Sequence, residues 1–467
     1  MSVRDRLDRL TGENKPAPPD DDNKKKISEL RARIERILER RPATKPATPG
    51  PSDLSDPGSA GVPTGRLGRR PSDSSDMSDA SDRSEAVYTP LGVESTTQGD
   101  EAATPFGKVF VATAELDAGE FWGRRRLREL QNLDMRAAAR LADDPRLASL
   151  APTDALFLDT ETTGLAGGTG TLAFLIGVGW FDGARFVTRL IFARDFTEEA
   201  AALATLRALA AGRKFLVTFN GKTFDAPLLA ARFILNRQPD PLANLPHLDL
   251  LHPSRRLLGH RLDNSRLVTL EEAVLGRRRE GDIPGSEIPQ RYFDYLRSRD
   301  ARLIADILDH NRQDIVSLAA LAAHLSELLT KGVDALDVEP SDVVAAARLH
   351  LLRGDPQAAE EMLRALCAAR EGEAVGEGGR ELSLIHKRAG RWDDAVALWR
   401  ARLAADAGDL FAVEELAKWL EHRQRNYADA IDLVDRLLLS ARLTDGDARE
   451  SFRYRLERLR RKAKNNG

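Results

Sequence analysis

Between residues 151 and 330, segments whose apolar positions are typical of strands alternate with segments typical of helices. The segment ALFLD, at Ala155–Asp159, is a short apolar run typical of a buried central strand. Two further apolar runs, Thr171–Phe181 and Ala184–Ala193, flank an Asp-Gly dipeptide that favours a hairpin turn. The three runs predict a meander of adjacent strands.

Helices and strands alternate after the predicted hairpin. Thr197 is expected to cap a helix that continues through an Ala- and Leu-rich run to Ala211. Upstream, Lys108–Thr113 predicts a strand and Leu127–Ala142 predicts a helix. The remaining predicted elements are a strand at Lys214–Phe219, a helix at Ala226–Asn236, a strand at His247–Leu251, a helix at Leu270–Leu275 and a long helix at Arg302–Leu329. This order predicts an α/β mixed sheet flanked by helices.

Residues 340–464 have helical periodicity and contain three similar segments. Ala359, Ala395 and Ala430 occupy matching positions, 36 and 35 residues apart, which is close to the tetratricopeptide period of ~34 residues. We expect an all-α domain of tetratricopeptide-like repeats that binds a protein partner and whose removal leaves the activity of residues 151–330 largely intact. An ordinary helical bundle is the alternative.

Residues 1–104 have the composition of a disordered tail, because Pro, Ser, Asp and Gly dominate most of this segment. A narrow apolar stripe predicts one short helix at residues 23–40, which either frays in solution or docks on a partner. Residues 105–150 are expected to be an N-terminal extension packed on the domain at residues 151–330.

The composition of the chain limits its class. Its 467 residues are 42% hydrophobic and 31% charged, which is enough for at least one large core. The single cysteine, Cys367, excludes a disulfide framework and a cysteine-based zinc site. No secretory signal is visible, and the longest apolar run is far shorter than the ~20 residues that cross a bilayer. We expect a cytoplasmic protein without a membrane partner.

Two carboxylates end the predicted central strand. Asp159 and Glu161 are two residues apart, so their side chains project from the same face. Placing two like charges together is costly unless a cation lies between them. Mg²⁺ and Mn²⁺ take carboxylate oxygens as ligands. The pair predicts a divalent-metal site, although solvated strand ends show the same pattern.

Two more carboxylates and a histidine extend this candidate site. Asp225 ends the segment NGKTFD at the start of a predicted helix, where it gains from the helix dipole or serves only as a cap. His310 and Asp314 lie one turn apart in the middle of the apolar stripe of the long helix. An inward carboxylate needs a metal or a partner, whereas a lone histidine there is more often a satisfied core residue.

Together the four carboxylates could hold two Mg²⁺ or Mn²⁺ ions ~4 Å apart, the arrangement used for in-line displacement at phosphorus. His310 would take the proton from the attacking water, because histidine titrates near neutral pH.

The segments LFLDTETTG, NGKTFD and HNRQD resemble the three motifs of the DEDD exonuclease superfamily, which has a ribonuclease H-like fold. The segment RREGDIPGSEIPQRYFDYLRS, at Arg278–Ser298, resembles one carried by the YprB-like branch. The resemblance implies 3′–5′ removal of nucleotides from DNA or RNA. It implies that the metal ligands are Asp159, Glu161, Asp225 and Asp314. The sequence departs from the pattern at His310, a histidine placed at the spacing of the tyrosine-type subgroup.

Contacts with nucleic acid would need local positive charge, because the formal charge of −3 excludes a uniformly basic surface. Arginines gather between the last predicted strand and the long helix, where they could follow phosphates or form a solvated face paired with nearby acids. The candidate nucleic-acid-binding residues are Asn220, Arg255, Arg256, Arg261 and Arg266. Only 6% of residues are aromatic, which argues against binding chiefly by base stacking.

Two questions stay open from the sequence. Asp249, in HLDLLH, has three possible roles: an auxiliary metal ligand, a group that orients a metal ligand, or a surface or structural residue. The alternative function is a non-catalytic nucleic-acid-binding or scaffolding protein that keeps the same fold and recruits a partner through its repeats.

Overall fold

The structure, a computed structural model, describes residues 90–164, 170–370, 372–373, 376–440 and 443–466. The predicted helix at residues 23–40 and most of the predicted tail lie outside these residues.

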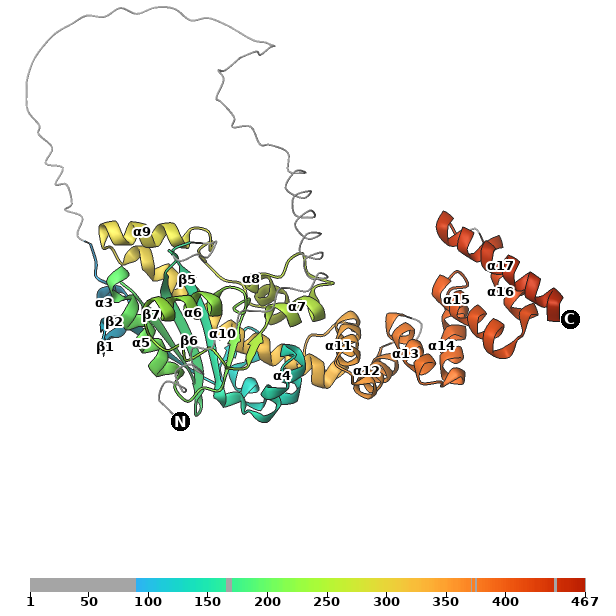
Figure 1. Ribbon diagram of the computed structural model, residues 1–467, viewed down its shortest axis with the longest axis horizontal. Coiled ribbons are helices and arrows are strands. Elements are labelled where there is room, and N and C mark those ends of the chain that lie inside the picture. Colours follow the sequence, from blue (N-terminus) through green and yellow to red (C-terminus); the bar gives the residue numbers. More distant parts are fainter. Residues whose placement is uncertain (1–89, 165–169, 371, 374–375, 441–442, 467) are drawn as a thin grey trace, which may run out of the picture. The chain divides into compact units, whose positions relative to one another are not determined.

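A mixed sheet of seven strands forms the centre of the N-terminal half of the described chain (Figure 1). The strand order is β1-β2-β7-β6-β5-β8-β9, with antiparallel pairing from β1 to β5 and parallel pairing of β5, β8 and β9. The strands are β1 (Gly99–Thr104), β2 (Gly107–Asp117), β5 (Ala155–Thr162), β6 (Ala173–Asp182), β7 (Arg185–Phe192), β8 (Phe215–Thr218) and β9 (His247–Asp249). A separate small ribbon pairs β3 (Phe121–Trp122) with β4 (Arg125–Arg126). The predicted mixed α/β architecture is confirmed.

The β6–β7 hairpin follows from its turn residues. Gly183 has a φ of +57°, which glycine adopts at little cost, and Asp182 pairs with Arg185 across the turn. The strand β1, in contrast, corrects the predicted tail, which extended to residue 104. Among the described residues β1 pairs with β2 alone, as an edge strand, and its sequence GDEAAT has no large apolar residue, so composition alone does not reveal it.

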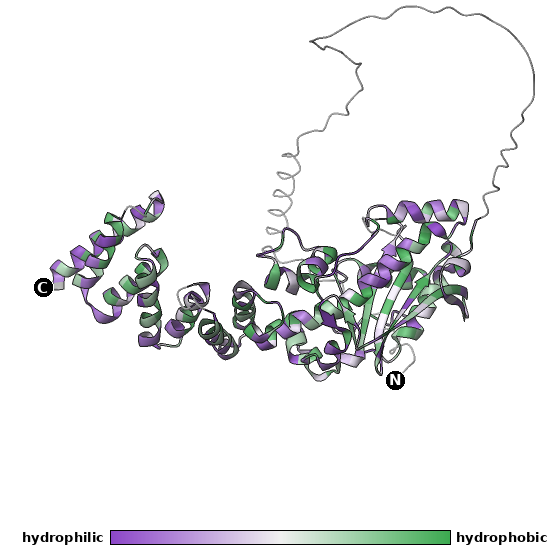
Figure 2. Cartoon of the chain, turned by 180° about the vertical axis from the view of Figure 1, so that it is seen from behind, coloured by the Kyte–Doolittle hydropathy of each residue, from purple (hydrophilic) through white to green (hydrophobic). Residues whose placement is uncertain are grey.

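Helices cover both faces of the sheet (Figure 1). Leu156 and Leu158 of β5 pack in one core cluster with residues of α5 and α6, whereas Phe157 packs in another with residues of α10. Hydrophobic residues lie along the strands and on one side of many helices (green in Figure 2). The helices of this half are α3 (Val93–Thr96), α4 (Met135–Ala142), α5 (Glu199–Ala210), α6 (Asp225–Leu235), α7 (Leu251–Leu258), α8 (Leu267–Leu270), α9 (Ile288–Ser298) and α10 (Arg302–Lys331).

The long helix α10 is a core element. The segment Arg302–Asp334 is long and apolar enough to cross a membrane by length and composition, yet 83% of its most apolar window is buried within the protein. Its burial against β5, β6 and β7 accounts for its apolar character.

Three predicted helices differ from the structure. The helix expected at Leu127–Ala142 is a 3₁₀ segment and then α4, because Asp134 accepts a hydrogen bond from the Arg136 backbone and starts a new helix. Thr197 is not a capping residue. The Asp195 side chain accepts a hydrogen bond from the Thr197 backbone N–H, and α5 begins at Glu199. The helix expected at Leu270–Leu275 is the end of α8 followed by a π-helical turn.

The C-terminal half is helical, as predicted. Its helices are α11 (Pro340–Leu352), α12 (Pro356–Ala369), α13 (Glu377–Arg388), α14 (Trp392–Ala405), α15 (Leu410–Trp419), α16 (Tyr427–Leu439) and α17 (Gly446–Asn466). The matched alanines Ala359, Ala395 and Ala430 are fully buried, one each in α12, α14 and α16. Small side chains at these positions let successive helices approach closely.

Candidate active site

The central strand aims its carboxylates at α10. Side chains alternate along β5, so Asp159 and Glu161 share the face of Phe157, which is covered by α10. The Asn311 side-chain amide donates a hydrogen bond to Asp159 Oδ2 at 2.7 Å. Asn311 thereby fixes the direction of the Asp159 carboxylate.

A glycine in the neighbouring strand makes this contact possible. Gly177 of β6 pairs with Asp159, and a Cβ atom at Gly177 would lie 1.9 Å from Asn311 Oδ1. Any side chain at residue 177 would displace Asn311. The sequence analysis identified neither residue. A glycine inside an apolar strand is the signal that could have indicated a close approach.

The third carboxylate enters from α6. Asp225 is the first residue of that helix and is 7% exposed. The Thr160 hydroxyl, on β5, donates a hydrogen bond to Asp225 Oδ1 at 2.5 Å. Asp225 is therefore bonded directly to the strand that carries the first two carboxylates.

Asp249 holds the loop that precedes α6. Its carboxylate accepts backbone hydrogen bonds from Asn220 at 2.7 Å, Lys222 at 3.0 Å and Leu251 at 3.1 Å. Asn220 has a φ of +66°, a left-handed conformation that such anchoring stabilises. With both oxygens engaged by backbone donors, Asp249 is a loop anchor, which is the structural alternative among the roles considered for it.

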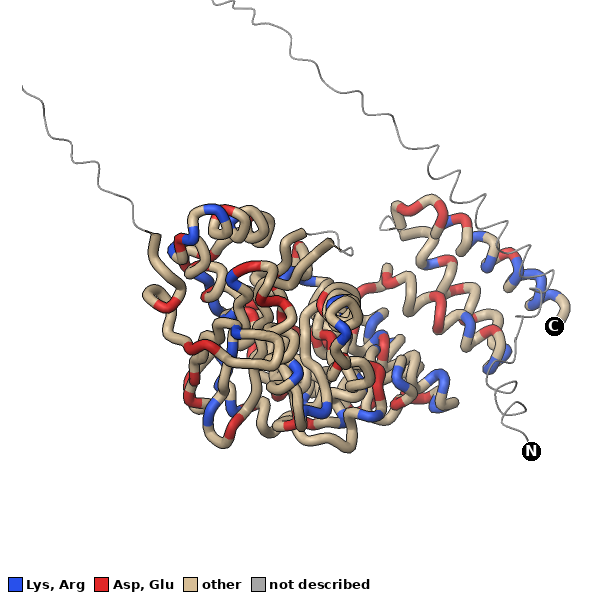
Figure 3. Tube along the Cα trace, turned by 60° about the vertical axis from the view of Figure 1, so that its left-hand side comes forward, with Lys and Arg blue, Asp and Glu red and all other residues tan. Residues whose placement is uncertain are grey.

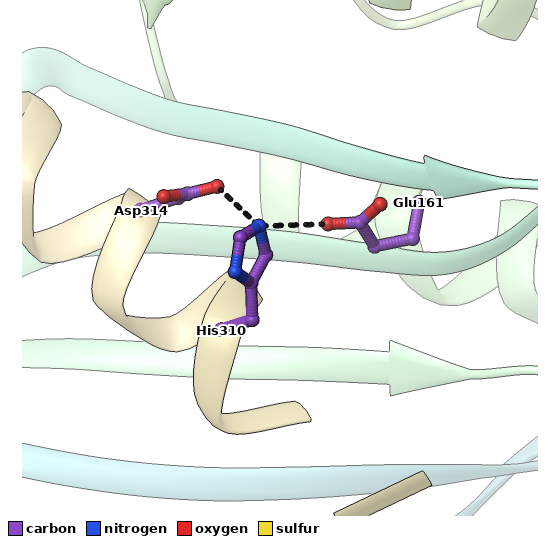
Figure 4. Close-up of side chains that lie close together, drawn as sticks. All are labelled: Glu161, His310 and Asp314. Carbon is purple, nitrogen blue, oxygen red and sulfur yellow. Dashed lines mark ion pairs between the residues drawn. The ribbon is translucent and has the colours of Figure 1, made fainter. Parts of the chain in front are cut away.

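The fourth carboxylate and the histidine project from α10 toward β5 (Figure 4). His310 Nε2 lies 3.4 Å from Asp314 Oδ2 and 3.8 Å from Glu161 Oε1. The three side chains offer ligand atoms that all lie within 4.8 Å of one another. The inward direction expected from the helical periodicity is thus the direction observed.

A buried arginine lies against this group. Arg279 is 1% exposed in its side chain, and its guanidinium donates two hydrogen bonds of 2.6 Å to Glu271 and one to Asp314. Sequence reasoning placed Arg279 only in an arginine cluster facing either phosphates or acids. Its pairing with Glu271 follows the second possibility, and its contact with Asp314 could not be foreseen.

Burial and mutual repulsion strain the carboxylates electrostatically. Burial raises the pKa of Asp159 well above its ordinary value, and the charges of Asp314 and Asp225 raise this pKa further. The pKa of Glu161 is raised by the same causes. Burial raises the pKa of Asp225 to about 6. Arg279 opposes the shift in the pKa of both strand carboxyls. A divalent cation would relieve this repulsion, and hard carboxylate oxygens are the donors that Mg²⁺ and Mn²⁺ prefer.

The candidate nucleic-acid-binding residues divide into two groups. Arg255, Arg256 and Arg266 have exposed side chains. Arg261 instead forms ion pairs of 3.0 Å with Glu339 and with Asp342, at the start of α11. This departs from the expected phosphate contact, because Arg261 joins the two halves of the described chain.

Charge is otherwise mixed over the described residues. Figure 3 shows Lys and Arg interspersed with Asp and Glu along most of the chain, with basic residues more frequent near the C-terminal end.

The order of the strands and the acidic cluster on the central strand β5 can be compared with known families of proteins. Residues 156–326 match the family model described as the RNase_H superfamily, and the chain belongs to this superfamily. It is 33% identical over 312 residues to the uncharacterized protein YprB of Bacillus subtilis (strain 168). That alignment covers 66% of this chain and 74% of YprB.

Proposed function

We propose that the protein is a divalent-metal-dependent nuclease that hydrolyses phosphodiester bonds of DNA or RNA, as a 3′–5′ exonuclease of the DEDD type. The observation that carries the proposal is that Glu161 of β5 and Asp314 of α10 meet at His310. Asp159 of β5 and Asp225 of α6 lie near enough to this group for the carboxylate charges to raise the pKa of Asp159 and Glu161. The raised pKa values of Asp159, Glu161 and Asp225 indicate that ionised carboxylates are unfavourable at these positions without a cation. Such an arrangement is expected where a function requires it.

Four side chains would hold the metal: Asp159, Glu161, Asp225 and Asp314. Bound Mg²⁺ or Mn²⁺, with two ions expected, supplies charge neutralisation for in-line displacement at phosphorus. His310 Nε2 faces the same space and would accept the proton of the attacking water. Asn311 and Thr160 would keep Asp159 and Asp225 aimed at that space.

The substrate would reach the site beside exposed arginines. Arg255, Arg256 and Arg266 form no ion pair with the other described residues and are the proposed phosphate contacts, together with Asn220 at the start of the loop before α6. The helices α11–α17 are proposed to be tetratricopeptide-like repeats that bind a protein partner, on the basis of their matched buried alanines.

One observation favours the alternative of a non-catalytic protein that binds nucleic acid or serves as a scaffold. Arg279 is a buried cation that already neutralises part of the negative charge by bonding to Asp314. A protein without bound metal could use Arg279 to keep its inherited carboxylates together.

The experiment that separates the two functions measures mononucleotide release from end-labelled single- and double-stranded DNA and RNA. The full-length protein should release mononucleotides with Mg²⁺ or Mn²⁺ but not with EDTA, and a blocked 3′ end should stop release. Asp159→Asn should abolish release, whereas Asp182→Asn, an exposed carboxylate in the β6–β7 turn, should not. Binding of these strands without any release would favour the scaffold.

A further inference from the structure

A third acidic residue contacts His310 at the ring nitrogen that does not face the candidate metal ligands. Asp282 lies in the loop between the π-helical turn that follows α8 and the helix α9. Asp282 Oδ1 is 2.6 Å from His310 Nδ1, whereas the other ring nitrogen, Nε2, faces Glu161 and Asp314. The imidazole is therefore held between one carboxylate outside the proposed ligand set and two inside it.

We propose that Asp282 is a positioning residue that holds the Nδ1 proton and the ring orientation of His310, so that Nε2 faces the reacting water. This inference rests on the proposed nuclease function. Two groups contact Nδ1: Asp282 Oδ1 at 2.6 Å, which accepts hydrogen bonds when ionised, and Arg279 Nη1 at 3.3 Å, which only donates them. The Asp282 contact is much the shorter of the two, and it is the one that places the proton on Nδ1 in this proposal. Carboxylates play this part for histidines in many active sites and metal sites.

The loop that carries Asp282 is itself fixed. Ile283, the next residue, is 4% exposed and packs in the core with residues of α9 and α10. On the other side, Arg279 Nη1 lies 3.4 Å from Asp282 Oδ2, and Arg279 is anchored by Glu271. Asp282 is thus held from both directions, as a residue that orients another side chain must be.

This contact also selects the orientation of the His310 ring. His310 stands one helical turn before Asp314, so its ring could rotate about its Cβ–Cγ bond and present carbon instead of nitrogen to Glu161 and Asp314. The bond to Asp282 selects one of the two ring orientations.

The first test is kinetic and uses full-length protein. Asp282→Asn keeps the size of the side chain but removes its charge, and should lower kcat by about 10- to 100-fold while KM changes by less than about threefold. Glu280→Gln, an exposed acidic residue two positions away, is the matched control and should keep wild-type kcat. Wild-type kcat in Asp282→Asn would overturn the inference.

The second test does not depend on activity. In protein labelled with ¹⁵N-histidine, the ring signal of His310, assigned from its loss in His310→Gln, should show a proton on Nδ1, and Asp282→Asn should change that signal. A neutral ring protonated only at Nε2 in the wild type would overturn the inference. If the wild type releases no nucleotides, the proposed function fails, and the ring signal still decides whether Asp282 holds His310.

Discussion

At the scale of single residues, the site depends on neighbours that aim the carboxylates as much as on the carboxylates themselves. Asn311 fixes Asp159, Thr160 fixes Asp225, and Asp249 fixes the loop before α6. Each of these contacts can be removed by a substitution that leaves the proposed metal ligands unchanged.

Gly177→Ala should disable the site through Asn311. The new Cβ would lie 1.9 Å from Asn311 Oδ1 and 3.1 Å from Ile315 Cγ1, so α10 and β6 cannot both keep their places. Crowding of this kind costs about 1–3 kcal/mol. Urea unfolding should show that loss, and metal-dependent release should fall at the same time.

The control for this prediction is Gly446→Ala, where an added Cβ meets nothing within 4 Å. It should leave stability and release unchanged. A Gly177→Ala protein as stable and active as the wild type would contradict the role given to Asn311.

Asp249→Asn should loosen the loop that carries Asp225. The carboxylate accepts three backbone hydrogen bonds, and an amide has only one oxygen with which to accept them. We expect a loss of about 1–3 kcal/mol in unfolding free energy, measured by urea denaturation, and a lower kcat. Asp263→Asn, at an exposed position, should match the wild type; equal stability of the two variants would show that Asp249 is no anchor.

The raised carboxyl pKa values predict how stability depends on pH. A carboxyl group whose folded pKa lies above its unfolded pKa stabilises the fold below the unfolded value and loses that contribution as pH rises through the folded value. For Asp225 the folded pKa is about 6. Metal-free protein should therefore melt at a lower temperature at pH 8 than at pH 5, and Mn²⁺ should raise the melting temperature more at pH 8. An equal effect of Mn²⁺ at both pH values would contradict the assignment.

At the scale of elements, apolar runs and turn residues were sufficient to predict most of the central sheet. The strands β6 and β7 are buried along most of their length, and so is the first half of β5, so these segments are largely apolar. The inward positions of His310 and Asp314 followed from the period of α10 for the same reason. Where burial determines composition, the sequence is a reliable guide.

The elements that the sequence analysis did not predict were missed for other reasons. The edge strand β1 and the helices α7 and α9 are only partly buried, so their composition resembles that of loops. Asp195 and Thr197 are both residue types that cap helices. The backbone geometry, which the sequence does not reveal, makes Asp195 the capping residue. Local sequence does not contain that information.

The residues of the candidate site also fall into two groups, those that the sequence predicts and those that it does not. Its four carboxylates and histidine lie in motifs on regular elements and could be identified from the sequence. The places of Arg279, Glu271 and Asp282 depend on an irregular segment between α8 and α9 whose path only the tertiary structure fixes. Their contacts could not be predicted from spacing.

At the scale of the whole molecule, the two halves of the described chain share a core. The cluster that contains Phe157 and Ile315 continues through Val343 of α11 to Leu363 and Leu382. A second cluster, in α14–α17, is separate. The core is therefore continuous across residue 340, where the sequence analysis expects a domain boundary, and we predict that a separable module begins after α13.

This packing changes the expected effect of truncation. A chain that ends at residue 339 exposes the apolar surface that α11–α13 cover; uncovering two leucine-sized side chains costs about 3–6 kcal/mol. Its melting temperature should fall by about 10 °C or more, measured by calorimetry. A chain that ends at residue 390 keeps α11–α13 and should melt close to the wild type. Equal melting of the two truncated chains would show that the interface contributes nothing.

The most direct test of the whole account is a titration of full-length protein with Mn²⁺, followed by electron paramagnetic resonance of the free ion. The account predicts binding of about two ions per chain, weakened strongly in Asp159→Asn and in Asp314→Asn but not in Asp182→Asn. Absence of binding in the wild type, or equal binding in all four proteins, would contradict the claim that these carboxylates form a metal centre.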